Sequence, residues 1–333
     1  MDLQKIKEFL TETRQPAFRI KQIEKNYYQG KAKNFDEMTD LSKDLRASLS
    51  DKFSLLSVEL EQMNTEGHTQ KALLKLADGK KIESVLMDYD NWLTVCISTQ
   101  VGCALNCKFC ATGKMGFIRN LTQEELVDQI IFWNKQIFPQ YVGRVVFMGM
   151  GEPFLNWDNV IESLKIINSP DYLNIGARKI SISTAGIVDK IKEFADLDTQ
   201  INLAISLHSV DQQTRESIMP ISKKFPFNEL KNACNYYVGK TNRQLFFEYA
   251  PMQGINDSVE NARQLASFIQ SNRLFYLNII PLNSVTNGLT PSSQRDFDNF
   301  VRVLDSKHVQ FTIRRSFGQN LNAACGQLVV DCK

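Results

Sequence analysis

The chain has 333 residues, of which 43% are hydrophobic, 23% charged and 10% aromatic, and this composition excludes a disordered, collagen-like or coiled-coil protein. The 39 basic and 37 acidic residues give a formal net charge of +2, so a nucleic acid would have to bind local basic patches. No apolar run approaches the roughly 20 residues of a membrane helix, and the charged N-terminus lacks a signal region, so we expect a cytoplasmic protein without a membrane partner.

The first predicted unit is helical and spans residues 1–56. Leu3, Ile6 and Phe9 fall on one helical face, and leucines repeat with the same spacing between positions 41 and 49. Alternating segments follow at 56–62, 73–76 and 82–87, and Asp78-Gly79 is a hairpin turn signal between the last two. We therefore expect a short β extension over residues 57–92, which carries Glu83.

Residues 93–333 alternate between apolar strands and segments of helical spacing, which predicts a parallel sheet. The six strands are expected at Thr94–Ser98, Arg144–Met150, Lys179–Thr184, Ile201–Leu207, Gln244–Met252 and Tyr276–Leu282. A last strand, Val309–Arg314, is expected at the sheet edge. Six βα units are too few for a closed eightfold barrel, so we expect an α/β fold with an incompletely closed barrel or an open sheet and ligands at the carboxyl ends of the strands.

Three pairs of residues mark the starts of helices in this region. Thr122 with Glu125 and Asp257 with Glu260 have the spacing of capping boxes. Thr290-Pro291 has the form of an N-cap followed by a proline in the first turn.

The cysteines carry the strongest chemical signal. Seven cysteines without a secretion signal argue against a disulfide framework. Cys103, Cys107 and Cys110 form a C-x3-C-x2-C triplet directly after the first strand of the sheet. Three thiolates can hold three corners of a [4Fe–4S] cluster and leave the fourth iron open to a substrate, whereas structural zinc needs four ligands. A zinc site completed by a distant Cys or His is the alternative.

An open iron can chelate the amino and carboxylate groups of S-adenosylmethionine (SAM), and the triplet with Phe109 before its last cysteine resembles the radical-SAM superfamily. Seven segments in order also resemble the RlmN/Cfr group of RNA adenine methyltransferases, and the likeness runs from about Ile82 to Leu328. These segments are Cys96–Cys103, Cys110–Gly113, Gly116–Thr122, Phe147–Pro153, Ser206–His208, Met219–Ser222 and Ala323–Leu328.

This resemblance implies a partial (βα)6 radical-SAM barrel, with residues 1–56 as an RNA-binding accessory domain and residues 93–333 as the barrel and tail. It implies a [4Fe–4S] cluster and two SAM molecules per turnover. The implied target is carbon 2 of an adenosine in the peptidyl-transferase centre of 23S rRNA and, in the RlmN branch, the adenosine next to the anticodon of some tRNAs. A reducing electron donor such as flavodoxin is implied, and we expect a monomer.

The resemblance also implies roles for single residues. Cys325 matches the cysteine that carries the methyl group, Cys96 the thiol that later forms a disulfide with it, and Glu83 the proton acceptor. The positions that match SAM-binding residues are Gly151, Glu152, Ser183, Ser206, Leu207, His208 and Asn283. Cys234 and Cys332 match no family position. Outside this context, Cys325 would be a buried apolar thiol, Glu83 a solvent-facing residue and His208 a core histidine.

Three alternatives remain open on the sequence. Methylation at carbon 8, the Cfr activity, shares nearly every catalytic residue, although Pro153 and Pro281-Leu-Asn283 are more similar to the carbon 2 branch. A zinc-stabilised RNA-binding protein would leave Cys96 and Cys325 without a task. A sulfur-inserting radical enzyme normally needs a second cysteine set. Basic residues that could meet RNA phosphates are Arg119, Arg178-Lys179, Lys223-Lys224, Arg314-Arg315 and those of the N-terminal helices, Arg14, Arg19, Lys21 and Lys25.

Overall fold

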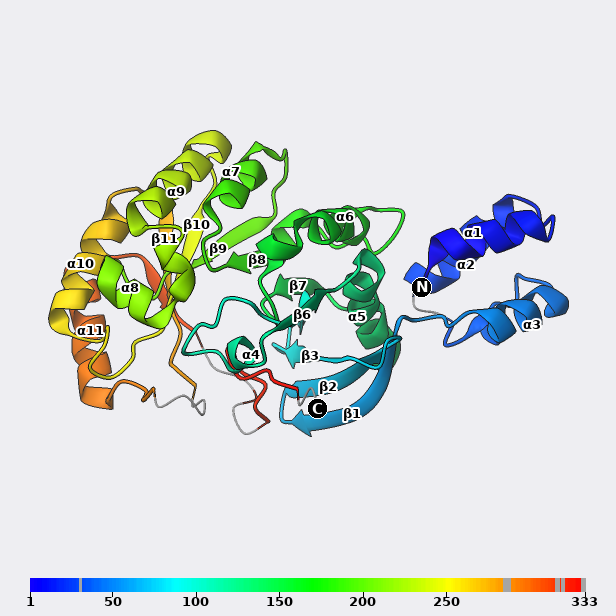
Figure 1. Ribbon diagram of the computed structural model, residues 1–333, viewed down its shortest axis with the longest axis horizontal. Helices are drawn as coiled ribbons and strands as arrows, with labels where there is room; N and C mark the ends of the chain where they lie inside the picture. Colours follow the sequence, from blue (N-terminus) through cyan, green and yellow to red (C-terminus); the bar gives the residue numbers. More distant parts are fainter. Residues whose placement is uncertain (30–31, 284–288, 315–317, 319–320, 331–333) are drawn as a thin grey trace.

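One ten-stranded sheet forms the centre of the computed structural model, which describes residues 1–29, 32–283, 289–314, 318 and 321–330 (Figure 1). Its strands follow the order β1-β2-β3-β4-β7-β8-β9-β10-β11-β12. Their bounds are β1 Val58–Glu66, β2 Thr69–Leu76, β3 Lys81–Asp88, β4 Leu93–Cys96, β7 Arg144–Phe147, β8 Ile180–Thr184, β9 Asn202–Ser206, β10 Leu245–Tyr249, β11 Phe275–Ile279 and β12 Phe311–Ile313.

The sheet has an antiparallel part and a parallel part. Strands β1 to β4 pair antiparallel, with Asp78-Gly79 in the turn between β2 and β3. From β4 to β12 every pairing is parallel. Within the described part of the chain, β1 and β12 each pair with one neighbour, so the sheet does not close. This confirms the predicted α/β fold with an incomplete barrel and a last strand at its edge.

Helices follow the parallel strands along the chain. They are α4 Ala111–Lys114, α5 Gln123–Gln136, α6 Trp157–Asn168, α7 Val188–Asp196, α8 Gln212–Ile218, α9 Phe227–Thr241, α10 Val259–Gln270 and α11 Gln294–Ser306, with short 3-10 turns η2 Pro153–Asn156, η3 Ala177–Lys179 and η4 Pro220–Lys223. One large core joins them to the sheet, with Phe147, Phe247 and Phe300 among its fully buried side chains. No helix among the described residues has the length and apolarity that a membrane crossing requires.

One of the three predicted helix starts is right. Thr122 and Glu125 form the capping box of α5. The box of α10 is Ser258 with Asn261, because the Asp257 carboxylate accepts hydrogen bonds from the Gly254 amide at 2.9 Å and the Ser292 hydroxyl at 2.7 Å.

The expected N-cap at Thr290-Pro291 is also wrong. Ser293 caps α11, and Pro291 forms an antiparallel bridge with Met252 instead. Both errors lie close to the true start, since several residues with capping side chains follow one another there.

The N-terminal helices α1 Leu3–Glu12, α2 Phe18–Tyr28 and α3 Lys43–Lys52 share a second core with Val127 and Ile131 of α5. A short turn, η1 Phe35–Glu37, lies between α2 and α3. The buried Asp128 of α5 accepts hydrogen bonds from the Ser57 amide at 2.7 Å, the Ser57 hydroxyl at 2.6 Å and the Tyr27 hydroxyl. One carboxylate therefore fixes both the helical unit and the start of the β extension to the barrel.

Replacement of this carboxylate should destabilise the protein. Asp128→Ala leaves the buried donors of Ser57 and Tyr27 without an acceptor, so we expect the free energy of unfolding to fall by about 2–3 kcal/mol. Urea denaturation measures it, and Asp171→Ala, at an exposed position, is the matched control. Equal losses in the two variants would contradict the assigned role of Asp128.

Candidate active site

The cysteine triplet lies on a loop that is closed at its base. Two short strands that the sequence did not predict, β5 Gln100–Gly102 and β6 Phe117–Asn120, pair antiparallel on either side of it. The Cys103 amide donates to the Gly116 carbonyl at 2.9 Å. Gly102 has φ +75°, and a Cβ there would lie 1.8 Å from the Gly116 oxygen, so only glycine permits this closure.

All three cysteines line one cavity of about 170 Å³, which we call the inner cavity. Cys103 and Cys107 are buried, and Cys110 is partly buried. Burial raises the pKa of Cys103 to about 12 and that of Cys107 well above its ordinary value. A metal would therefore have to displace the protons of Cys103 and Cys107 on binding.

The number of thiols suits a multi-iron cluster. Three cysteines of one loop face one cavity, and three thiolates can hold a [4Fe–4S] cluster with one open iron, whereas structural zinc takes four ligands.

Most of the predicted SAM-binding positions share this cavity. Gly151, Glu152, Ser183, Ser206, His208 and Asn283 line it together with the cysteine triplet. They follow or end β7, β8, β9 and β11, so the inner cavity lies at the carboxyl ends of the strands, as expected. Leu207 differs, because its side chain is fully buried and lines neither this cavity nor the second one described below.

Glu152 is bound to the backbone around it. Its buried carboxylate accepts hydrogen bonds from the Phe154 amide at 3.0 Å and the Ala185 amide at 2.8 Å. Burial raises its pKa, while Thr184 and these amides act in the opposite direction. Gly151 has φ +101°, and a Cβ there would meet the Gln100 side chain at 2.6 Å. Gly151 and Glu152 thus form part of the cavity wall, and the Glu152 carboxylate can accept further hydrogen bonds from a ligand.

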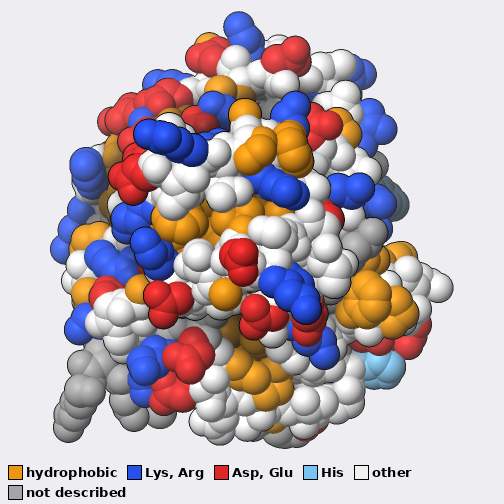
Figure 2. Space-filling view, turned by 90° about the vertical axis from the view of Figure 1, so that its right-hand side faces the viewer, with side chains coloured by type: hydrophobic (Ala, Val, Ile, Leu, Met, Phe, Trp, Pro, Cys, Tyr) orange, Lys and Arg blue, Asp and Glu red, His pale blue; other side chains and the backbone are white. Residues whose placement is uncertain are grey.

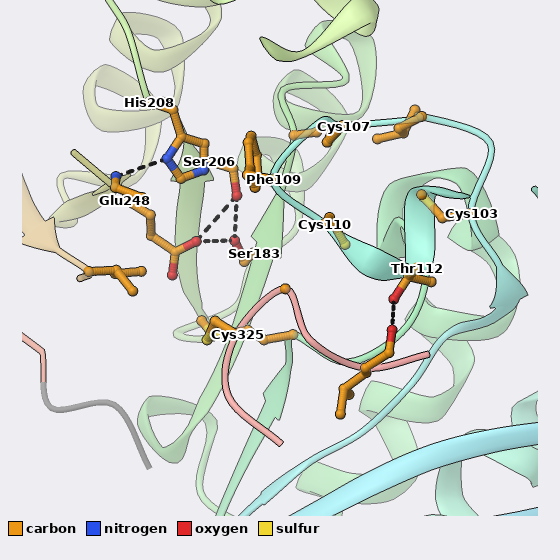
Figure 3. Close-up of a pocket in the computed structure, with 18 of the residues that line it drawn as sticks. Cys103, Cys107, Phe109, Cys110, Thr112, Ser183, Ser206, His208, Glu248 and Cys325 are labelled. Carbon is orange, nitrogen blue, oxygen red and sulfur yellow. Dashed lines mark hydrogen bonds between the residues drawn. The ribbon is translucent and has the colours of Figure 1, made fainter. Parts of the chain in front are cut away.

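His208 is held as a neutral ring. It has φ +54°, its Nδ1 accepts the Ala250 amide at 3.1 Å, and its ring lies 4.4 Å from that of Phe109 between centroids. Burial and the nearby Arg215 lower the pKa of His208 to about 3. The side chain therefore serves as an uncharged wall beside the cysteine loop (Figure 3).

Glu248 of β10 is a site residue that the sequence analysis missed. Its carboxylate oxygen Oε2 accepts the Ser183 hydroxyl at 2.6 Å and the Ser206 hydroxyl at 3.3 Å (Figure 3). An acidic residue inside an apolar strand is the signal that could have identified it, because carboxylates are rarely buried without a partner or a task. Glu248 gives this part of the site a negative charge.

Arg215 of α8 was missed as well. It is 1% exposed and donates to the carbonyls of Ala185 at 2.8 Å, Leu207 at 3.1 Å and Ser206 at 3.3 Å, and to the Ser222 hydroxyl at 2.6 Å. Burial lowers its pKa to about 10, so it remains a cation at neutral pH. Nothing in the local sequence of α8 marks this arginine as buried.

A second cavity of about 640 Å³, the outer cavity, shares one wall with the inner one. Six residues line both: Met148, Glu248, Ile280, Asn283, Cys325 and Leu328. Cys96 lines only the outer cavity, and the triplet lines only the inner one. Cys325 therefore faces both cavities. A residue that carries a chemical group from one cavity to the other has to lie in such a position.

Cys96 and Cys325 are free thiols whose pKa values are both raised. Burial, followed by Cys325, raises the pKa of Cys96. Cys325 is exposed to the cavities, yet desolvation by the surrounding protein and the Glu248 carboxylate raise its pKa to about 11. Both thiols therefore resist ionisation until a ligand or a base changes their surroundings.

The tail that carries Cys325 is held by contacts with its backbone. The Ala111 amide donates to the Gly326 carbonyl at 2.7 Å, and the Thr112 hydroxyl to the Leu328 carbonyl at 2.6 Å. Asn283 Nδ2 donates to the Cys325 carbonyl at 3.1 Å. The segment between residues 325 and 328 is thereby tied to α4, the helix that begins directly after Cys110.

Glu83 lies outside both cavities. Its carboxylate pairs with Lys71 Nζ at 2.7 Å and accepts the Val329 amide at 2.9 Å, so it anchors the same tail. Burial raises its pKa, and Lys71 and the Val329 amide partly oppose that effect. Cys234 is fully buried in α9 and lines neither cavity, while Cys332 and Arg315 lie outside the described residues.

Comparisons with known proteins identify the family of the chain. The radical SAM superfamily model matches residues 97–266, and the ribosomal RNA large subunit methyltransferase N-terminal domain matches residues 1–55. Two proteins named probable dual-specificity RNA methyltransferase RlmN are similar over 329 residues, 98% of this chain: that of Clostridium perfringens strain SM101 (41% identity, 94% of its length) and that of Clostridium novyi strain NT (42% identity, 95%). A crystal structure of a radical SAM methyltransferase from Sphaerobacter thermophilus superposes with a TM-score of 0.92 at 38% identity, covering 98% of this chain and 97% of that one.

The low pKa of His208 predicts a specific dependence of stability on pH. The pKa of His208 is about 3 in the folded protein and 6.5 in the unfolded chain. Between these two pH values, the unfolded chain binds a proton at this histidine and the folded protein does not. Stability from the neutral ring is therefore complete above pH 6.5 and is lost as the pH falls towards 3. From pH 7 to 5, the free energy of unfolding should fall about 2 kcal/mol more for the native protein than for His208→Asn.

Urea denaturation at the two pH values measures this difference. Asparagine is chosen because it tolerates positive φ and can accept the Ala250 amide. His68→Asn, at an exposed position, controls for the loss of a histidine. Identical pH dependence in the native protein and His208→Asn would refute the neutral-ring assignment.

Proposed function

The chain belongs to the RlmN branch of the radical-SAM RNA methyltransferases, and from that membership we propose that it methylates carbon 2 of an adenosine in 23S rRNA and of the adenosine next to the anticodon in tRNA. The curated relatives are named dual-specificity RNA methyltransferases, which supports two RNA substrates. The observation that carries the proposal is the position of Cys325 on the wall common to the two cavities, with the triplet on one side and Cys96 on the other.

In this proposal the inner cavity holds both cofactors. Cys103, Cys107 and Cys110 hold the [4Fe–4S] cluster, and SAM lies against Gly151-Glu152, the Ser183–Ser206–Glu248 group, His208 and Asn283, with Leu207 contributing its backbone. When bound there, cluster and SAM supply one-electron cleavage of a carbon–sulfur bond, which yields a group able to abstract a hydrogen atom. A low-potential donor such as flavodoxin is proposed to supply the electron.

Cys325 is the proposed methyl carrier. Its thiolate attacks the methyl carbon of a first SAM. The electron pair of the broken carbon–sulfur bond stays on the sulfur, which leaves as S-adenosylhomocysteine. After loss of one hydrogen atom, the methylene carbon on Cys325 joins carbon 2 of the adenine. To restore the aromatic ring, the adduct must then lose the ring proton and one electron, for which a cluster bound by Cys103, Cys107 and Cys110 would be the acceptor, and a thioether would link Cys325 to the RNA.

Cys96 is the proposed resolving thiol. Its thiolate attacks the Cys325 sulfur, and the sulfur–carbon electron pair moves to the former methylene carbon, which takes up a proton. The products are 2-methyladenosine and a Cys96–Cys325 disulfide, which an external reductant must reopen. Both thiols line the outer cavity, which supports a direct reaction between them.

Glu83 is proposed to accept the ring proton. Its raised pKa brings the carboxylate nearer to the range in which a general base works at neutral pH. Since Lys71 and the Val329 amide now occupy its oxygens, the tail has to move before Glu83 can act on a substrate.

The alternative is Cfr-type methylation of carbon 8 of the same rRNA adenosine. Adenosines of 23S rRNA and tRNA from cells that lack this protein, with and without its restoration, separate the two by mass spectrometry. We expect 2-methyladenosine to appear only on restoration. Appearance of 8-methyladenosine would transfer the assignment to the alternative, and absence of both would refute the proposed function.

Removal of the resolving thiol should trap the covalent intermediate. With Cys96→Ala, nothing attacks the Cys325 sulfur, so we expect RNA to stay attached to the protein on a denaturing gel. Cys234→Ala is the matched control, because that thiol is fully buried elsewhere. Loss of the attached RNA in the double variant Cys96→Ala/Cys325→Ala identifies the linkage, whereas a persistent adduct would contradict the role of Cys325.

Cluster binding can be tested without activity. Cys107→Ser should lower the iron and sulfide content of the purified protein to background, since one corner of the cluster loses its thiolate. Cys234→Ser should retain both. Zinc in place of iron and sulfide in the native protein would refute the cluster assignment.

A further inference from the structure

The outer cavity opens at the opposite ends of the strands from the cysteine triplet. Arg144 is the first residue of β7, and Val146 and Met148 follow it at every second position along the cavity wall. Lys179 directly precedes β8, and Asn202 begins β9. The cavity therefore runs along the inner face of the sheet from the amino ends of the strands to Cys325.

An aromatic stack forms part of this mouth. Tyr89 and Trp92 lie in the turn between β3 and β4 with their rings stacked, 6.1 Å between centroids and 25° between planes. The Arg144 guanidinium lies 4.2 Å from the centroid of the Trp92 ring. Trp92 is 41% exposed, an unusual degree for a tryptophan in the wall of a cavity. Stacked aromatic and guanidinium planes at an open mouth suit unstacked nucleobases.

Basic side chains without salt bridges surround the mouth. Arg144, Arg178, Lys179 and Arg314 line the outer cavity and are exposed, and no salt bridge involves any of them within the described residues. By contrast, Arg119, also a candidate RNA contact, is paired with Asp78 and Glu125. Unpaired cations at one rim are suited to phosphates.

Two acidic residues, Asp88 and Asp90, share this rim with the four basic ones. Asp88 Oδ1 accepts the Asp90 amide at 2.8 Å, and Asp90 lies 3.8 Å from His68 Nδ1. On the side of the molecule that carries α1–α3, basic and acidic side chains are interspersed (Figure 2). Basic and aromatic side chains thus lie together at the mouth of the outer cavity, and Cys96 and Cys325 line the same cavity.

We propose that the outer cavity is the RNA-binding site at which the target adenosine, unstacked from its neighbours, reaches Cys96 and Cys325. The Tyr89–Trp92–Arg144 stack binds an adjacent base, and Arg178, Lys179 and Arg314 contact the phosphates on either side. This inference rests on the proposed RNA substrate and adds the surface that binds it.

The test measures binding and cofactor chemistry separately. The probe is an unmodified, fluorescently labelled transcript of the peptidyl-transferase segment of 23S rRNA, titrated with the iron-loaded protein. Trp92→Ala should weaken binding about 5- to 150-fold, the range for one stacked base, and Trp92→Phe should restore most of it. Arg178→Gln/Lys179→Gln should make the plot of log affinity against log salt shallower by about 1.4, the contribution of two phosphate contacts.

The controls separate this inference from the proposed function. Arg263→Gln/Lys240→Gln removes the same charge from exposed positions on α10 and α9 and should leave the salt dependence unchanged. Formation of 5′-deoxyadenosine without RNA and the melting temperature should stay native in every variant. If the native protein binds and methylates the transcript while the Trp92 and Arg178/Lys179 variants bind it equally well, the surface assigned here is wrong. If the native protein does not bind the transcript, the proposed function itself fails.

Discussion

The site depends on one buried cation. Arg215 donates hydrogen bonds to the Ser222 hydroxyl and to carbonyls at the ends of β8 and β9, namely those of Ala185, Ser206 and Leu207. A buried charge costs several kcal/mol unless hydrogen bonds compensate for it, and here four acceptors do so. Ser183 and Ser206 lie at the ends of these two strands, and His208 follows β9. Because Arg215 fixes the backbone at both strand ends, it also fixes the side chains that line the inner cavity there. Burial, followed by the charge of Arg215, lowers the pKa of the neighbouring His208.

The two cavities result from the parallel sheet itself. Side chains of a strand alternate between its faces, so every second residue of β7 from Arg144 to Met148 lines the same interior. Carboxyl ends offer the turns that hold polar ligands, while amino ends begin with the basic residues Arg144 and Lys179. The two ends of the same strands thereby form the cofactor compartment at one end and the basic mouth at the other. Glu248 and Cys325, on the shared wall, are the groups that connect them.

The sequence predicted what depends on local pattern. The parallel strands, the hairpin at Asp78-Gly79 and the capping box at Thr122 follow from periodicity and turn chemistry, and the structure confirms them. Local pattern does not predict contacts between segments that are distant in the sequence. The pairing of Glu83 with Lys71 and Val329, the burial of Arg215 and the joining of Ser183 to Glu248 each depend on tertiary packing. Leu207, directly after β9, fell within a family-like segment, yet its side chain is fully buried in the core.

The attachment of the tail has a geometric consequence. Gly326 and Leu328 are bonded to Ala111 and Thr112, which directly follow Cys110 in the chain. The same tail is bonded to the sheet, because the Cys325 carbonyl accepts from Asn283, which follows β11, and the Val329 amide donates to Glu83 of β3. A displacement of the cysteine loop relative to the sheet therefore requires one of these two sets of bonds to break. The tail thus cross-links the metal-binding loop to the sheet, and the sulfur of Cys325 lies on that cross-link.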